Sequence, residues 1–334
     1  MPAASIPPWG LGQRVAGRYE VTRRIDAGAM GEVWAAHDTL RDRPVALKRL
    51  TGVDPRSPDH AEAVERLRRE AVFTSQLRHP GIVEVYDLAV EGAEPVLVME
   101  LLSGVTLEEH LRVAHHLAED IAVEWMSQVL DALAAAHAAG VLHRDLKPAN
   151  VFLAADPGAR FGARVKLFDF GLSKALPRGD DSDRTELTLH NVFLGSLRYA
   201  SPEQLDGNRP LDPRSDLYAV GVMLFGALTG SHPAGSDKPN DIVLRSLSGN
   251  VERSPRALRP AVSPSLDAVT QRALAHAPEG RYGSAAEMAA ALRGAGEQTT
   301  STSGVKTKTA GAPWWLLVLV ALAGGAGWAM WALR

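Results

Sequence analysis

The chain has 334 residues, of which 46% are hydrophobic and 22% charged, and this is enough to bury a sizeable core in about two domains or lobes. A formal net charge of −3 provides no basic field, so a nucleic acid is not expected as a partner. The absence of cysteine excludes disulfides, thiolate metal sites and a cysteine nucleophile, and it is compatible with a reducing cytosol.

The first third of the chain is predicted to be mostly strands. Residues 1–17, "MPAASIPPWGLGQRVAG", contain no apolar run and are expected to form a tail that is not a secretory signal peptide. Residues 18–38 and 43–50 interleave β-branched and aromatic residues with charge, which predicts strands joined by turns. The pattern then predicts an amphipathic helix over residues 59–78 and further strands in 81–90 and 95–102.

Helical patterns dominate from Thr106 onward. Predicted helices cover residues 118–140, 214–230, 263–275 and 284–294, and the first two end at glycines. A strand-rich part followed by a helical part predicts an α+β protein. We expect two lobes, a small β-rich N-lobe over residues 18–102 and a larger helical C-lobe over residues 103–293.

The C-terminal part is predicted to be a linker and a membrane segment. Residues 294–313 are rich in Thr, Ser and Gly and are expected to form a flexible linker. Residues 314–333 carry no charge, have tryptophans at both ends, and would span roughly 30 Å as a transmembrane helix. A buried core helix and a removable lipid-anchor signal are the alternatives. Lys306 and Lys308 precede this segment and favour a cytosolic location for the preceding domain.

Three short stretches mix polar and apolar residues in a way that solvated loops do not require. "VALK" places Lys48 among apolar residues, where an unpaired lysine would be costly to bury. "VLHRDLKPAN" (141–150) joins a base, a cation and an amide, and "VKLFDFG" (165–171) ends a strand at a carboxylate suited to magnesium. Solvated surface charges would explain each stretch alone, but not their joint order along the chain. Phosphoryl transfer needs this combination, since it depends on positioning and charge compensation.

Together, these motifs resemble those of the eukaryotic-type (Hanks-type) bacterial serine/threonine protein kinases with a transmembrane segment. The resemblance covers residues from about 18 to about 293, and it implies the two-lobed protein kinase fold. Lysine at position 147, two residues after Asp145, resembles serine/threonine kinases rather than tyrosine kinases.

The resemblance implies a role for each polar residue. Asp145 would accept the proton of the substrate hydroxyl, and Lys147 would neutralise charge on the moving phosphoryl group. Asn150 and Asp169 would hold Mg²⁺, with Mn²⁺ as an alternative. Lys48 would contact the phosphates of ATP and pair with Glu70, in preference to Glu62 or Glu65. His143 is expected to be structural.

The resemblance also implies a nucleotide pocket. Its residues are Ile25, Gly28, Gly31, Val33, Ala46, Lys48, Glu70, Met99, Glu100, Leu102 and Phe152, with Glu100 and Leu102 supplying backbone hydrogen bonds to adenine. Asp26 stands where the family pattern G-x-G-x-x-G-x-V has its first glycine. Its carboxylate is expected either to repel phosphate or to cap the turn.

A polar segment between Asp169 and Ser201 resembles an activation loop. Within it, Thr188 is the expected phosphorylation switch, Thr185 is the second choice, and Ser196 is expected to contact Asp145 and Lys147. Arg144 would pair with the loop phosphate. The scaffold is expected to include a pair between Glu203 and Arg281, and Asp216 bonded to the backbone around Asp145.

The expected function is ATP-dependent phosphorylation of Ser and Thr hydroxyls in protein substrates by a membrane-anchored enzyme. We expect a single-pass protein of the cell inner or plasma membrane with a cytoplasmic kinase domain. A pseudokinase scaffold is the alternative, and a small-molecule kinase of related fold is less compatible with the long loop after Asp169. A homodimer through the membrane helix and the kinase domain is one explanation of the small-xxx-small spacings in residues 321–327. Chance in an alanine-rich segment explains these spacings equally well.

Overall fold

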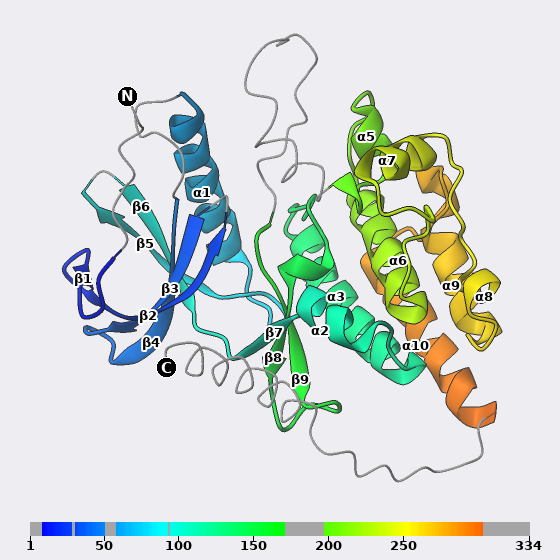
Figure 1. Cartoon of the computed structure of the whole chain (residues 1–334), viewed down its shortest axis with the longest axis horizontal. Helices are drawn as coiled ribbons and strands as arrows, with labels where there is room; N and C mark the ends of the chain where they lie inside the picture. The colour runs from blue at the N-terminus through cyan, green and yellow to red at the C-terminus, as the bar shows by residue number, and fades with distance from the viewer. Residues whose placement is uncertain (1–8, 29–30, 51–57, 93, 171–196, 303–334) are drawn as a thin grey trace, which may run out of the picture.

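A computed structural model describes residues 9–28, 31–50, 58–92, 94–170 and 197–302. Two lobes lie side by side, with the strand-rich N-lobe on the left of Figure 1 and the helical C-lobe on the right. The N-lobe carries one antiparallel sheet in the order β1-β2-β3-β4-β6-β5 and one long helix. Its elements are β1 (Arg14–Val15), β2 (Tyr19–Gly28), β3 (Gly31–Asp38), β4 (Arg43–Arg49), α1 (Pro58–Gln76), β5 (Val85–Glu91) and β6 (Glu94–Glu100).

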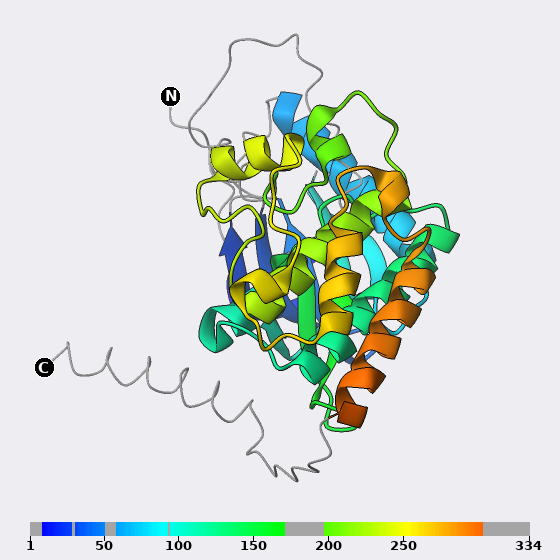
Figure 2. The same ribbon diagram turned by 90° about the vertical axis from the view of Figure 1, so that its right-hand side faces the viewer.

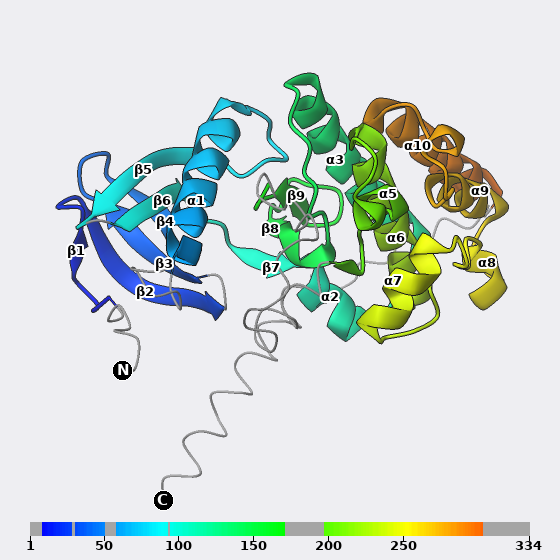
Figure 3. The same cartoon turned by 90° about the horizontal axis from the view of Figure 1, so that it is seen from above.

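The C-lobe combines a small sheet with a set of helices. Its sheet, ordered β7-β8-β9, lies next to the N-lobe, as the view from above shows (Figure 3). The strands are β7 (Gly104–Thr106), β8 (Val151–Ala155) and β9 (Ala163–Leu167). The helices are α2 (Leu107–Ala114), α3 (Glu119–Ala138), η1 (Pro148–Asn150), α5 (Pro202–Asp206), α6 (Pro213–Thr229), α7 (Pro239–Leu247), α8 (Pro255–Leu258), α9 (Pro264–Ala273), η2 (Pro278–Gly280) and α10 (Ala285–Thr302). The predicted α+β architecture is confirmed.

The two faces of the N-lobe sheet have different partners because side chains alternate along each strand. On the outer face, Val45 and Leu47 of β4 pack with Trp34, Val96 and other buried residues. On the inner face, Leu97 of β6 packs against Leu67 of α1. Lys48 therefore extends from the face opposite to Leu47, toward α1 and the C-lobe.

The C-lobe core forms around α3 and α6, which are apolar on most of their surface. Leu217, Leu224 and Phe225 of α6 are fully buried, as are Met126 and Leu130 of α3. Each side chain of this size stabilises the fold by about 1.5–3 kcal/mol when it is removed from water. The predicted glycine end of α6 is confirmed, since Gly230 adopts the left-handed conformation that ends the helix. This core provides a rigid base for the polar residues described below.

The predicted linker and the predicted N-terminal tail, which flank the kinase-like region, both differ from the structure. Helix α10 continues to Thr302, so the linker expected from residue 294 does not begin there. Ala295 is buried, and a Cβ at Gly296 would lie 3.0 Å from Val123 of α3. These small residues let α10 approach α3, beside which it runs in Figure 2. The expected tail also differs, since Trp9 and Val15 are buried in the N-lobe.

Within the described residues, no helix combines the length and apolar character that a membrane crossing requires. The predicted transmembrane segment, residues 314–333, lies outside the described part of the chain. The same is true of residues 303–313 of the predicted linker.

Candidate active site

The β8–β9 hairpin brings Asn150 and Asp169 to the same end of the small sheet. Asn150 directly precedes β8 and Asp169 follows β9 by two positions, and Val151 pairs with Leu167 across the two strands. The backbone N–H of Phe168 donates to the carbonyl of Asn150 over 3.3 Å. Asp169 has a positive φ of 55°, a conformation that a non-glycine residue adopts at some energetic cost. The two expected metal ligands are therefore neighbours.

Asp145 is held by Lys147 and Asn150, two later residues of the same motif. Lys147 donates from Nζ to Asp145 Oδ2 over 3.0 Å. Asn150 donates from Nδ2 to the backbone carbonyl of Asp145 over 2.8 Å. Because the nitrogen of the Asn150 amide is engaged with Asp145, its Oδ1 is the atom that suits a cation. Asp145 thus presents a carboxylate next to a cation and next to an oxygen ligand.

Asp216 of α6 fixes the backbone that directly precedes Asp145. Its carboxylate accepts hydrogen bonds from the backbone N–H groups of His143 and Arg144, each 2.9 Å long. His137 of α3 lies 2.8 Å away through Nε2. Burial would raise the pKa of Asp216, but the hydrogen bond from His137 and the other contacts outweigh burial, so the pKa lies below its usual value. The expected bond between Asp216 and this backbone is confirmed.

Lys48 joins the two lobes at the site. Its ammonium contacts the carboxylate of Asp169, although the two residues lie 121 positions apart. Lys48 is only partly exposed, and its ammonium lies beside the end of the β8–β9 hairpin that carries the expected metal ligands. Glu70 lies in α1, but its side chain is outside what the structure describes, so the predicted pair with Lys48 stays a prediction.

This arrangement agrees with a family comparison. A family model described as the protein kinase domain matches residues 19–291, which is most of the chain. The chain belongs to the protein kinase family.

The kinase is also similar to curated bacterial proteins. A probable serine/threonine-protein kinase of Streptomyces coelicolor is 37% identical over 83% of this chain and 39% of its own length. Serine/threonine-protein kinase PrkC of Bacillus subtilis is 35% identical over 85% of this chain and 41% of its own. Serine/threonine-protein kinase PknL of Mycobacterium tuberculosis is 38% identical over 84% of this chain and 66% of its own length. The chain therefore matches between two fifths and two thirds of the length of these relatives.

The expected nucleotide pocket of the kinase lies mainly on four adjacent strands, β2, β3, β4 and β6. Val33 of β3 pairs with Lys48 of β4, and Ala46 pairs with Met99 of β6. Paired residues share a face of the sheet, so these four side chains face the same side. Ile25 lies in β2 and is 40% exposed. Gly28 pairs with Gly31 at the end of the β2–β3 hairpin.

The other expected pocket residues lie at the junction of the lobes. Phe152 is in β8, where its ring makes an edge contact with Phe168 at 6.5 Å between centroids. Leu102 lies in the connection between β6 and β7, outside either strand. The backbone N–H of Glu100 donates to the carbonyl of Glu84 over 2.9 Å. A backbone hydrogen bond between Glu100 and adenine would therefore have to be accepted by the carbonyl oxygen of Glu100.

Asp26 uses its carboxylate locally. Its Oδ1 accepts a hydrogen bond from the backbone N–H of Ala27 over 2.8 Å. Asp26 pairs with Val33 in the sheet, so its side chain starts on the same face as the expected pocket. The capping alternative therefore has a structural basis, and the carboxylate is also near the base of the glycine-rich loop.

A buried ion pair holds the end of the activation segment to the C-lobe. Glu203 of α5 and Arg281 are joined by two bonds of 2.7 and 2.9 Å, and both side chains are almost fully buried. Ser215 of α6 donates to the same carboxylate over 2.8 Å. The predicted pairing of Glu203 with Arg281 is confirmed. The expected regulatory residues Thr185, Thr188 and Ser196 lie outside the described part of the chain.

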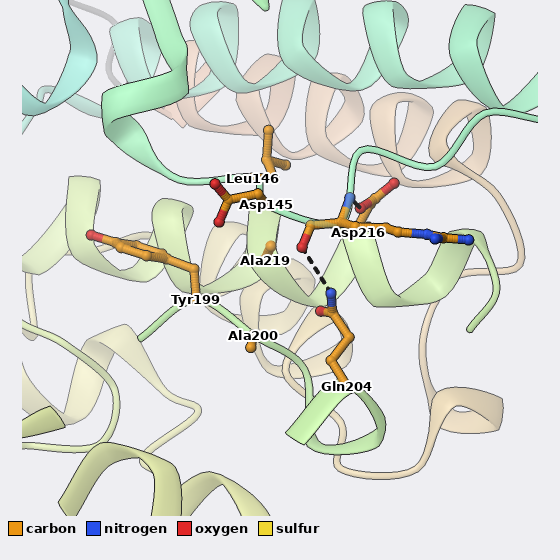
Figure 4. A pocket seen from close by; sticks show the side chains of 8 residues that line it. Asp145, Leu146, Tyr199, Ala200, Gln204, Asp216 and Ala219 are labelled. Atoms are coloured by element: carbon orange, nitrogen blue, oxygen red, sulfur yellow. Dashed lines mark hydrogen bonds between the residues drawn. The ribbon is translucent and has the colours of Figure 1, made fainter. Parts of the chain in front are cut away.

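Sequence reasoning missed Gln204 and the side-chain role of Glu100. Gln204 of α5 donates from its amide to the backbone carbonyl of Arg144 over 2.9 Å, beside the small pocket near Asp145 and Tyr199 (Figure 4). The carboxylate of Glu100 accepts a 2.6 Å bond from Lys166 of β9. A signal for Gln204 was available, since glutamine three residues after Ser201 is the capping-box spacing. Local patterns give no such signal for Glu100 and Lys166.

Proposed function

We propose that the kinase transfers the γ-phosphoryl group of ATP to Ser or Thr hydroxyls of protein substrates. The observation that carries this proposal is the contact between Lys48 and Asp169 at the end of the hairpin that also bears Asn150, next to Asp145. A cation that can bind phosphate, two residues that can bind a metal, and a base thus lie together at the junction between the lobes. The names of the relatives, which specify serine/threonine-protein kinases, support the choice of acceptor.

The residues present would act as follows. Asp145 accepts the proton of the substrate hydroxyl while the new O–P bond forms and the bond between the γ-phosphorus and the bridging oxygen breaks, releasing ADP. Lys147, 3.0 Å from Asp145, neutralises charge on the transferred group. Lys48 holds the phosphates that remain on the nucleotide. Because Asp216 anchors the backbone N–H groups of His143 and Arg144, directly before Asp145, the carboxylate of Asp145 needs little reorganisation before the reaction.

The oxygen ligands of Asn150 and Asp169 fit Mg²⁺, with Mn²⁺ as an alternative. Hard divalent cations prefer carboxylate and amide oxygens and often complete their coordination with water and phosphate oxygens. Bound at these two residues, the ion would neutralise charge on the phosphates of ATP. The partly exposed carboxylate of Asp169 is compatible with a ligand that arrives with the nucleotide.

The test is phosphosite mapping after the purified protein is incubated with Mg-ATP and a generic basic protein, beside the Asp145→Asn variant. Phosphoserine and phosphothreonine should appear with the wild-type protein and be lost in the variant. Nucleotide binding without any transfer by the wild-type protein would instead favour the alternative of a pseudokinase scaffold, for which the replacement of a glycine by Asp26 is the specific observation.

We also propose that residues 314–333 anchor the enzyme in the cell inner or plasma membrane, with the kinase domain in the cytoplasm. The uncharged 20-residue stretch, its terminal tryptophans, and Lys306 and Lys308 before it support this topology. Cleavage of the kinase domain by a protease added outside intact cells would contradict it. A homodimer through this segment and the kinase domain, and autophosphorylation of the activation loop, complete the proposal.

A further inference from the structure

The segment Trp9–Val15 precedes the residues matched by the family model, yet it is part of the N-lobe. Strand β1 pairs with β2, which places it at the sheet edge on the far side from the C-lobe (Figures 1 and 3). Two further backbone bonds join Gly12 and Gln13 to Val21, 2.8 and 2.9 Å long. Trp9 is 7% exposed and belongs to the outer-face core cluster. The segment Trp9–Val15 is therefore fastened to the outer face of the sheet.

Trp9 covers a buried ion pair between neighbouring strands. The guanidinium of Arg49 lies over the Trp9 ring, 4.5 Å from its centroid, and Arg49 is only 4% exposed. Arg49 donates from Nε and Nη2 to Glu32 Oε2 over 3.0 and 2.7 Å. Trp34, whose ring centroid is 6.1 Å from that of Trp9, donates to the same oxygen over 3.1 Å. One aromatic side chain thus stacks on the cation that joins β3 and β4.

The cover matters because water and salt weaken an ion pair that they can reach. Exposed pairs contribute little and are screened by salt, whereas pairs shielded from water are screened much less. Burial would raise the pKa of Glu32, but hydrogen bonds from Arg49 and Trp34 outweigh burial and the pKa lies below its usual value. The pair therefore stays charged, and its strength depends on what shields Arg49.

The ion pair lies directly across the sheet from the expected nucleotide pocket. Glu32 stands between Gly31 and Val33, and Arg49 follows Lys48, so the pair and the pocket residues extend from opposite faces of the same strands. The strands are in close contact there, because a Cβ at Gly31 would lie 2.1 Å from the carbonyl oxygen of Arg49. Any change in the spacing of Glu32 and Arg49 would therefore move the base of the glycine-rich loop and Lys48.

We propose that Trp9 is a positioning residue for nucleotide binding, which acts by shielding the Arg49–Glu32 pair on the far face of the sheet. The inference rests on the proposed function in naming ATP as the nucleotide. Trp9 itself does not touch the nucleotide. Its effect is on the geometry of Gly31, Val33 and Lys48, which the ion pair maintains.

The test compares Trp9→Ala with Trp9→Phe and with Leu11→Ala in the full chain. Leu11 is in the same segment but 74% exposed, so its loss should leave nucleotide binding unchanged. Calorimetry should give a dissociation constant for Mg-ATP that is about threefold to tenfold higher in Trp9→Ala than in wild type. A change of this size corresponds to part of the free energy that a shielded cation–π contact contributes. Trp9→Phe keeps an aromatic face and should recover most of the affinity.

Ionic strength distinguishes positioning from a general loss of stability. Relative to wild type, the dissociation constant of Trp9→Ala should rise further between about 50 mM and about 500 mM salt, because its ion pair is exposed to screening. Equal affinities for all variants at both salt concentrations would overturn the proposal, whatever the change in melting temperature. If Trp9→Ala does not fold, Arg49→Lys replaces it, and an unchanged affinity there has the same meaning. Because binding is measured, absence of phosphoryl transfer would refute the proposed function without deciding this one.

Discussion

Lys48 and Asp169 meet although they belong to different lobes, and their contact shows what each charge can do. Lys48→Met removes the only charge of its side chain, and Asp169→Asn removes a negative charge from an expected metal ligand. Each substitution should lower phosphoryl transfer at least about a hundredfold, the usual effect of losing a charge that stabilises a transition state. The fold should persist, since neither residue is in the core. Substantial autophosphorylation by either variant, with unchanged circular dichroism, would contradict these roles.

Asp26 permits a test of the glycine-rich loop at a single position. Asp26→Gly removes a carboxylate near the expected phosphates and releases the N–H of Ala27, so Mg-ATP should bind several-fold more tightly. Asp26→Asn is the control, because it removes the charge and keeps the local hydrogen bond. A Gly variant that binds ATP no better than wild type would mean that Asp26 acts only as a turn cap.

His232 links the activation segment to the loop after α6 as a neutral side chain. Its Nδ1 accepts from the N–H of Ala234, so Nε2 carries the proton and donates to the carbonyl of Arg198 over 2.8 Å. Burial lowers the pKa of His232 to about 4. The unfolded chain gains a proton near pH ~6.5, whereas the folded chain gains it only near pH 4. Stability is therefore full above this window and is lost as the pH falls through it, by at most about 3 kcal/mol.

Denaturant unfolding between pH 7 and pH 4 measures this effect of His232. His232→Gln cannot titrate and should reduce the slope of unfolding free energy against pH in that window. The slope should not vanish, because burial also lowers the pKa of His143. An identical slope in the variant would show that His232 has the same pKa in the folded and unfolded states, which would contradict the effect of burial.

At the scale of elements, the Glu203–Arg281 pair fastens α5 to the segment between α9 and α10. Arg281→Met leaves a buried carboxylate without its partner and should destabilise the protein by about 3–5 kcal/mol. Arg293→Met is the matched control, since the pair between Arg293 and Asp131 is nearly half exposed and should contribute less than about 1 kcal/mol. Equal losses in chemical denaturation would mean that the buried pair is no more important than the exposed one.

Besides the contact between Lys48 and Asp169, further side-chain and backbone bonds connect the two lobes. Lys166 of β9 and Glu100 of β6 are mostly buried, and Leu167 exchanges backbone hydrogen bonds with Gly81 and Val83 just before β5. The strand that leads to Asp169 is thus attached directly to the N-lobe. The residues expected to bind the nucleotide and the metal can therefore share one site although they come from separate lobes.

At the scale of the whole molecule, we expect phosphorylation of Thr188 to switch the enzyme on, in trans between two anchored copies. Arg144 precedes Asp145 and is exposed, so it can receive a loop phosphate, and confinement in a membrane would raise the effective concentration of the copies. Thr188→Ala should reduce activity toward an exogenous substrate at least about tenfold. A catalytically dead copy should still be phosphorylated when it is mixed with an active one.

Thr185→Ala is the control for this switch and should retain most of the activity. Full activity of Thr188→Ala, with mapped phosphates only in residues 299–303, would place the switch elsewhere. The result does not depend on dimerisation through residues 314–333, which cross-linking of the full chain in membranes tests separately.

The sequence by itself determined the chemistry and the order of the lobes. Asp145, Lys147 and Asn150 lie within six residues, so their mutual contacts follow from one local motif. The two lobes followed from the period-2 pattern of the strands and from the long apolar helices, because both patterns record which face of an element is buried.

Only the tertiary structure decided contacts between residues that are far apart in the chain. Lys166 and Glu100 are separated by 66 positions, and Gln204 and Arg144 by 60, so no local period links them. Trp9 follows a proline-rich stretch that is typical of a tail, and Ala295 and Gly296 have the small size typical of a linker. Trp9 becomes core because Arg49 and Trp34 lie against it, and the other two because α3 does. Burial depends on the path of the whole chain, and composition over a few residues does not contain that path.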